Sequence, residues 1–199
     1  MELFTLSKKM LEFICVDGED PLTHYQVYPF STHFNLDILS QINFNSIEHA
    51  TLEVYSHDLG RDVERLDAQG LANVYHEAFQ NWSDHAPINS TLTVGIFFGS
   101  KGICCGFYDG GDFFRNPKLK HQIENRVPFE KFDERTRGDN CQSGFNEHIY
   151  PCSDMLEVDV DKGILYAAML KEYIIAPAGE QGSDYCYKQR CNRLNVEYY

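Results

Sequence analysis

Three polar residues near the middle of the chain are spaced so that they can act on one ligand together. Glu77 and Asn81 are four residues apart, and His85 follows after another four. On a helix, side chains four residues apart lie on the same face, one turn above the other. The same pattern is typical of the solvated face of an amphipathic helix, and the helix considered alone favours that interpretation.

A carboxylate followed by two glycines occurs further along the chain. Asp109-Gly110-Gly111 comes directly after the apolar residues 103–108. Alone, these three residues predict only a turn. At the end of a strand, however, a carboxylate can accept a hydrogen bond from a base, and glycines let a planar ligand approach the backbone. The order of helix, hairpin and Asp-Gly-Gly therefore favours a ligand site.

A helix and a sheet must bring these residues together. Apolar residues recur at three- and four-residue spacing from residue 63 onward, which predicts a helix that is clearest over 72–82. It ends near Asp84, before Pro87, because the residue preceding a proline is disfavoured in the helical conformation. Turn glycines separate β-rich stretches that predict two antiparallel hairpins, with strands at 91–98 and 103–108 and at 155–160 and 164–170.

These elements predict an α/β fold of the α+β type. We expect a two-layer sandwich in which helices pack on one face of a mixed, mostly antiparallel sheet. At 199 residues the chain is expected to form a single domain. Its predicted parts are an N-terminal extension at 1–60, a core at 63–170 that includes a lid at 111–150, and a tail at 176–199. In the extension we expect strands at 10–16, 25–30 and 51–55 and a helix at 37–42. In the lid we expect a helix at 117–126.

Charge and composition exclude several classes of partner. The net charge of -13, from 30 acidic and 17 basic residues, repels the phosphates of nucleic acids and of anionic membranes. No apolar stretch approaches the roughly 20 residues that span a bilayer, and the first residues do not form a signal peptide. Seven cysteines are an odd number for a disulfide framework, so we expect mostly reduced thiols in a cytoplasmic protein.

Two motifs of this chain resemble those of the GHKL family of ATP-binding domains, named for gyrase, the heat-shock chaperone, histidine kinase and the mismatch-repair protein. The family motif Glu-x-x-x-Asn-Ala-x-x-His is similar to residues 77–85, with Trp82 where the family has Ala. The motif Asp-x-Gly-x-Gly is similar to residues 109–113, with Phe113 in place of the last Gly. The glycine-rich lid motif aligns with residues 144–148, and the closing hairpin resembles the last two strands of the family.

The resemblance implies a Bergerat-like fold that binds ATP and Mg²⁺. Glu77 is the implied catalytic residue, which would polarise the attacking water or hydroxyl. Asp109 would accept a hydrogen bond from the adenine amino group, and Asn81 would be the metal ligand, since Mg²⁺ prefers oxygen. The cofactor-binding residues that the resemblance implies are Asn81, His85, Asp109, Gly111 and Gly144.

The sequence leaves two functions open. The first is an adenine-nucleotide binding protein with Mg²⁺-dependent ATPase or protein kinase activity. The second is a degenerate, catalytically inactive member that acts as a regulatory protein-interaction module. A sensor kinase is not expected, because fewer than 70 residues precede the nucleotide helix and they are predicted to be mixed strands, without the phosphoacceptor helices of such a kinase.

Other residues of the chain have chemistry that a metal or nucleophilic site would need. A zinc-protease helix is rejected because Gln80 stands where the second histidine is needed. Cys104 or Cys152 with His148 remains open as a nucleophilic pair, although buried structural cysteines are commoner. Zinc remains a minor alternative at Cys186 and Cys191 or at Cys141 and Cys152, although none of these pairs has the C-x-x-C spacing. Acidic residues of the second hairpin predict a solvated sheet face or a weak cation site: Asp154, Glu157, Asp159 and Asp161.

Overall fold

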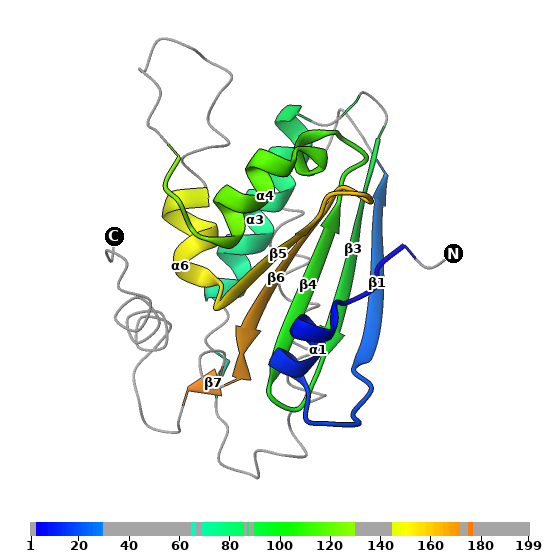
Figure 1. Ribbon diagram of the computed structural model, residues 1–199, viewed down its shortest axis with the longest axis vertical. Helices are drawn as coiled ribbons and strands as arrows, with labels where there is room; N and C mark the ends of the chain where they lie inside the picture. The colour runs from blue at the N-terminus through cyan, green and yellow to red at the C-terminus, as the bar shows by residue number, and fades with distance from the viewer. Residues whose placement is uncertain are drawn as a thin grey trace.

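The centre of the protein is an antiparallel sheet. The computed structural model describes residues 3–29, 65–66, 69–85, 87, 90–129, 145–171 and 175–176. Five strands pair antiparallel in the spatial order β1-β3-β4-β6-β5 (Figure 1). They are β1 (Leu22–Pro29), β3 (Thr91–Phe98), β4 (Gly102–Tyr108), β5 (Met155–Asp159) and β6 (Ile164–Leu170). A separate short ladder pairs β2 (Arg65–Leu66) with β7 (Ile175–Ala176).

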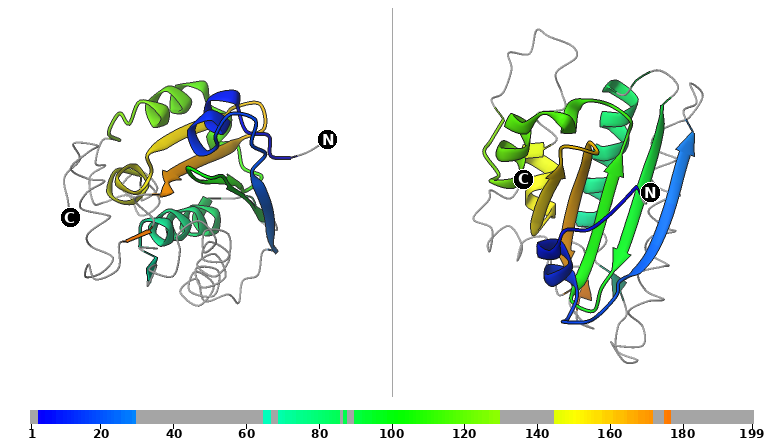
Figure 2. Two further views of the ribbon diagram at one scale, coloured as in Figure 1. Left: turned by 90° about the horizontal axis from the view of Figure 1, so that it is seen from below. Right: turned by 45° about the vertical axis from the view of Figure 1, so that its right-hand side comes forward.

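Helices lie on both faces of this sheet. The longest is α3 (Gln69–His85), and α1 (Lys8–Ile14) lies on the opposite face (Figure 2). The remaining elements are η2 (Phe113–Arg115), α4 (Pro117–Glu124), the π-helical turn η3 (Phe145–Ile149) and α6 (Tyr150–Cys152). No helix among these described residues is long and apolar enough to cross a membrane.

The face under α3 holds the larger core. The buried residues of α3 recur at three- and four-residue spacing, and they are Val74, Tyr75, Ala78, Phe79 and Trp82. They pack against side chains of β3, β4 and β6 that point toward the helix. This spacing gives the helix one apolar stripe, which must be buried against the sheet. The predicted helix at 72–82 is thus confirmed as the middle of α3, and the two-layer α+β class is confirmed with it.

The face under α1 holds a second core. Phe4, Met10 and Ile14 are buried there against side chains of β3, β4 and β6. Strand alternation places Cys104 in this core and Cys105 in the α3 core. The sheet is therefore covered on both sides, and the N-terminal segment with α1 is an addition that the sequence did not predict.

Most predicted elements are confirmed, and one is wrong. Strands 91–98, 103–108, 155–160 and 164–170, the strand at 25–30 and the helix at 117–126 appear with ends shifted by at most three residues. Residues 10–16 were predicted as a strand, but α1 occupies most of them. The Ser7 hydroxyl caps this helix by accepting from the Met10 amide at 3.1 Å, and Met10 and Ile14 are one turn apart on its buried face.

Several predicted segments fall outside the described residues. These are the helix at 37–42, the strand at 51–55, residues 130–144 of the lid and the tail after Ala176. Residue 176 itself belongs to β7, which pairs with β2 just before α3.

Candidate functional site

The structure brings Asn81 and Asp109 to the same cavity. Asn81 lies on α3, and Asp109 follows the last residue of β4. The two side chains line a cavity between the helix and the sheet, and the other residues of its wall are Ala78, Leu92, Phe107, Phe114, Ile149 and Leu165. An amide and a carboxylate from distant parts of the chain therefore face one otherwise apolar space.

The cavity is small in this conformation. Its volume is about 10 Å³. A cavity of about 10–15 Å³ is needed to hold one water molecule, whereas ligand pockets are typically about 300–1,000 Å³. A nucleotide therefore cannot enter without separation of the walls.

A tight turn orients the Asp109 carboxylate. Its Oδ1 accepts a hydrogen bond from the Gly111 amide at 2.8 Å. Gly110 between them has a φ of 76°, a region that residues with a side chain rarely adopt. The Asp-Gly-Gly sequence thus directs the carboxylate at the point where β4 ends, as the turn signal predicts.

Glu77 is buried, so the solvated-face interpretation of this helix face is wrong at that position. The residue is only 6% exposed. Its Oε1 lies 3.5 Å from Nε2 of His148, which belongs to η3. A buried carboxylate is costly unless it has partners, and the imidazole provides one of them. Glu77 lies one turn before Asn81, as its spacing predicts.

The other predicted site residues are placed less completely. His85 is the last residue of α3, but its side chain falls outside the described residues, and so does Gly144. Trp82, where the resembling family has Ala, is 3% exposed and donates from Nε1 to the Ser90 hydroxyl at 3.1 Å. This side chain belongs to the core under α3 and does not line the cavity.

The sequence does not predict that Phe114 and Ile149 line the cavity, and it pairs His148 with a cysteine and not with Glu77. Phe114 and Ile149 form part of the cavity wall, and His148 contacts Glu77. Their positions carry a weak signal, since Phe114 follows the Asp-Gly-Gly turn, His148 is the last residue of the segment aligned with the lid motif, and Ile149 comes directly after it. Nothing in the local pattern indicates which of these side chains reaches α3.

Burial argues against a cysteine nucleophile. The thiols of Cys15, Cys104, Cys105 and Cys152 are buried. Desolvation raises the pKa of Cys104 well above its usual value and raises the pKa of Cys105 to about 12. Only the thiolate is strongly nucleophilic, so both groups are inert near neutral pH. Cys152 is contacted by the amide of Asn73, at 3.6 Å from its Sγ. Cys141, Cys186 and Cys191 lie outside the described residues.

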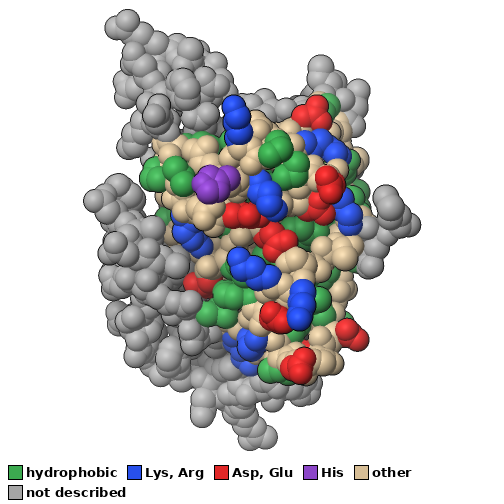
Figure 3. Space-filling view, viewed as in Figure 1, with side chains coloured by type: hydrophobic (Ala, Val, Ile, Leu, Met, Phe, Trp, Pro, Cys, Tyr) green, Lys and Arg blue, Asp and Glu red, His purple; other side chains and the backbone are tan. Residues whose placement is uncertain are grey.

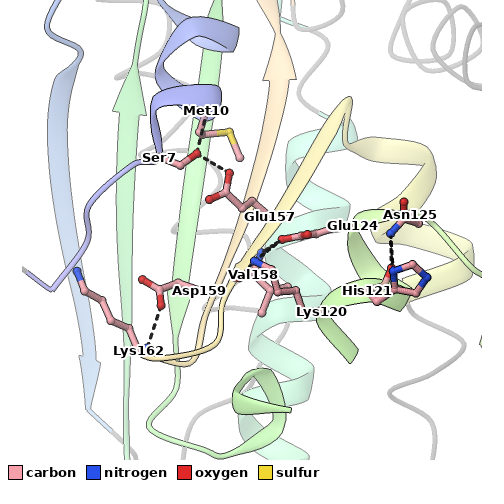
Figure 4. Close-up of polar contacts among 10 residues, drawn as sticks. All are labelled: Ser7, Met10, Lys120, His121, Glu124, Asn125, Glu157, Val158, Asp159 and Lys162. Atoms are coloured by element: carbon pink, nitrogen blue, oxygen red, sulfur yellow. Dashed lines mark hydrogen bonds and ion pairs between the residues drawn. The ribbon is translucent and has the colours of Figure 1, made fainter. Parts of the chain in front are cut away.

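Three of the four acidic side chains of the second hairpin accept hydrogen bonds from the protein, and Figure 4 draws those of Glu157 and Asp159. Glu157 accepts from the Ser7 hydroxyl at 2.6 Å, and Asp159 accepts from the Lys162 amide at 3.0 Å. Asp154 accepts from the Leu170 amide at 2.8 Å. In the described part of the chain, no group of three or more His, Cys, Asp or Glu residues is arranged to hold a metal ion.

A wider groove lies beside β5, on a face where charges of both signs are mixed (Figure 3). Its volume is about 600 Å³, and it runs between residues 5–7, Lys120 and the β5–β6 turn. The ammonium group of Lys120 contacts Glu124 at 2.9 Å and the Val158 carbonyl at 2.6 Å. That of Lys162 donates to the Leu3 carbonyl at 2.9 Å. Both ammonium groups therefore stabilise the fold through contacts within the protein.

Comparison with known proteins identifies no relative of this chain. No model of a protein family matches this chain, and no curated protein matches it.

Proposed function

We propose that this chain is a divergent GHKL-like domain that binds an adenine nucleotide together with Mg²⁺. The observation that carries the proposal is that Asn81 and Asp109, from α3 and from the end of β4, line the same cavity. Both belong to the motifs that resemble the family, and their side chains have the chemistry that the ligand requires.

The donor chemistry of the site fits the ligand. Asn81 offers an amide oxygen, a hard ligand suited to Mg²⁺, which would neutralise phosphate charge when bound. Asp109 offers an acceptor for an exocyclic amino group, and its orientation by the Gly111 amide favours one hydrogen-bonding direction. Glu77, one turn from Asn81, is the residue that we assign to proton abstraction from an attacking water or hydroxyl.

The volume of the cavity adds a condition to the proposal. Since the cavity holds about 10 Å³, binding requires an opened conformation. Leu92, Phe107 and Leu165 belong to the strands of the sheet, and Ala78 belongs to α3. Phe114 on η2 and Ile149 on η3 are walls that lie outside α3 and the sheet, and both are buried in the core, so opening the cavity must displace core side chains.

Thermal melting with and without nucleotide tests the proposal. Millimolar ATP or ADP with Mg²⁺ should raise the melting temperature by several degrees, because a ligand at 100 times its Kd stabilises the folded state by about 2.7 kcal/mol. Asp109→Asn should abolish the shift, whereas Asp112→Asn, at a side chain 97% exposed, is the matched control and should retain it. No shift with any adenine nucleotide would exclude the proposed function.

A second function is favoured by the closed cavity. A degenerate domain that no longer binds nucleotide would retain the fold and act as a regulatory protein-interaction module. Phosphate release separates an active enzyme from a binding protein. If turnover occurs, Glu77→Gln should abolish it without weakening nucleotide binding. Unchanged release in that variant would remove Glu77 from its assigned role.

A further inference from the structure

The turn η3 links the two halves of the candidate site. His148 places its imidazole 3.5 Å from the Glu77 carboxylate, and the next residue, Ile149, lines the cavity that Asn81 and Asp109 share. Both residues belong to one π-helical turn, Phe145–Ile149, which packs against α3. A displacement of η3 away from α3 would therefore break the imidazole contact and open the cavity wall together.

η3 is a short element that is held in place by buried side chains, since Phe145 and Ile149 are both 0% exposed. It is a single π-helical turn of five residues, a rare conformation that occurs often at functional sites. Phe145 attaches it to an aromatic cluster, with ring centroids 5.4 Å from Phe129 and 5.9 Å from Tyr150. The sheet strands, in contrast, are held by continuous hydrogen-bonded ladders.

We propose that the contact between Glu77 and His148 is a latch, which holds η3 on α3 and keeps the Asn81–Asp109 cavity closed until a nucleotide displaces it. This inference rests on the proposed function, since a nucleotide is the ligand that the opened cavity would admit. It adds a specific role for His148, whose imidazole regulates access to the site.

The strength of the latch follows from its surroundings. The His148 side chain is 42% exposed, so solvent screens its interaction with Glu77. A contact between a carboxylate and a partly exposed imidazole, which is an ion pair only when the imidazole is protonated, contributes modestly, and breaking it changes an equilibrium by about two- to fivefold. The apparent affinity of a ligand for a minor open state rises in proportion to the population of that state. Releasing the latch should therefore lower the Kd for nucleotide by about two- to fivefold.

Nucleotide titrations of latch variants test this role. His148→Ala and the conservative His148→Asn should both bind ATP with Mg²⁺ more tightly than the unmodified chain. His76→Ala is the matched control, because His76 lies on α3 beside Glu77 but is exposed. In a Glu77→Gln background, where the carboxylate is already lost, His148→Ala should have little further effect on Kd. Equal Kd values in all variants would overturn the latch.

Hydrogen exchange provides a readout that needs no nucleotide. Amides of residues 145–152 should exchange faster in His148→Ala than in His76→Ala or the unmodified chain, because η3 opens more often. Unchanged exchange would overturn the latch even if nucleotide binds. Faster exchange with no binding by any variant would sink the proposed function and the gating role, and would leave only a structural tether.

Discussion

On the face of the sheet that α1 covers, the Phe4 ring lies over two glycines, whereas the α3 face buries a carboxylate and leaves a cavity between Asn81 and Asp109. Gly95 and Gly106 are directly opposite each other on β3 and β4. A Cβ atom added to either one would come within 2.8 Å of the Phe4 ring. At these two glycines the α1 face is thus closely packed against the Phe4 ring.

The α3 face is packed differently near the candidate site. Glu77 is among its buried residues, and the Asn81–Asp109 cavity interrupts the apolar contacts. Buried polar groups and unfilled space both reduce stability, so a region that contains them is a candidate for function. This difference indicates that the α1 face contributes chiefly to stability, while the α3 face contributes to stability and also holds the candidate site.

Removal of the Phe4 ring should have the largest effect on the free energy of unfolding. Phe4 is 1% exposed and lies 6.0 Å, between ring centroids, from Tyr25. Phe4→Ala should lower the free energy of unfolding by about 3–5 kcal/mol, measured by urea denaturation. Val16→Ala, at a residue 55% exposed, should change it little. If nucleotide affinity, measured where both proteins are folded, also fell in Phe4→Ala, the two faces would not be separable.

A methyl group at Gly95 tests the close packing of the same face. All three of the nearest atoms to an added Cβ belong to the Phe4 ring. Gly95→Ala should therefore cost about 1–3 kcal/mol of unfolding free energy through overpacking. In the Phe4→Ala background the same substitution should cost almost nothing, because the obstructing ring is gone. Equal costs in the two backgrounds would show that the strain lies elsewhere.

Alkaline pH should probe both faces through their buried thiols. The folded pKa of Cys105 is about 12, against an ordinary value of 9.0, and burial also raises the pKa of Cys104. Since only the unfolded chain releases these protons above pH 9, each thiol should lower stability with rising pH by up to about 1.4 kcal/mol per pH unit. For Cys105 this loss runs from pH 9 to about 12 and is absent at neutral pH.

Single substitutions separate the two thiols. Cys104→Ala removes the titrating group of the α1 face, and Cys105→Ala removes that of the α3 face. Each variant should show a shallower loss of unfolding free energy between pH 9 and 11 under reducing conditions. A slope unchanged by Cys105→Ala would mean that water reaches the thiol on the α3 face.

The smallest effect on stability is expected at the edge strand β5, which contributes side chains to both cores. Glu124 accepts from the Val158 amide at 2.9 Å, and Lys120 donates to the carbonyl of the same residue (Figure 4). Glu124→Ala should cost about 1 kcal/mol in urea denaturation, because the Val158 amide loses this acceptor. Lys8→Ala, which breaks an ion pair with side chains 90% and 66% exposed, should cost less than about 0.5 kcal/mol. Equal losses of unfolding free energy in Glu124→Ala and Lys8→Ala would contradict a stabilising role for the hydrogen bond between Glu124 and the Val158 amide.

The sequence predicted the fold well where periodicity is local. The apolar spacing around Val74 and Phe79 predicts α3, and turn glycines such as Gly163, with a φ of 72°, mark the hairpins. The prediction from the sequence is wrong at α1, because a run of apolar residues there predicts a strand. Short apolar runs fit either helix or strand, and here the Ser7 cap and the packing of Met10 decide for the helix.

The candidate site was predicted in part. Motif spacing identified Asn81 and Asp109, which do line one cavity. It did not identify His148 as the partner of Glu77, because no local pattern relates a helix to a turn so distant in the chain. It also did not predict how little space the walls leave, since cavity volume depends on the rotamers of Phe114 and Ile149 together.

The amino-acid sequence by itself determined the elements and the faces on which their residues lie. Helical and strand periods follow from backbone geometry, so α3 has one apolar stripe and Cys104 and Cys105 point to opposite faces. Only the tertiary structure decided that Glu77 is buried against His148 and that the cavity is closed. Those outcomes depend on which side chains meet across distant segments, and packing of the whole core selects them.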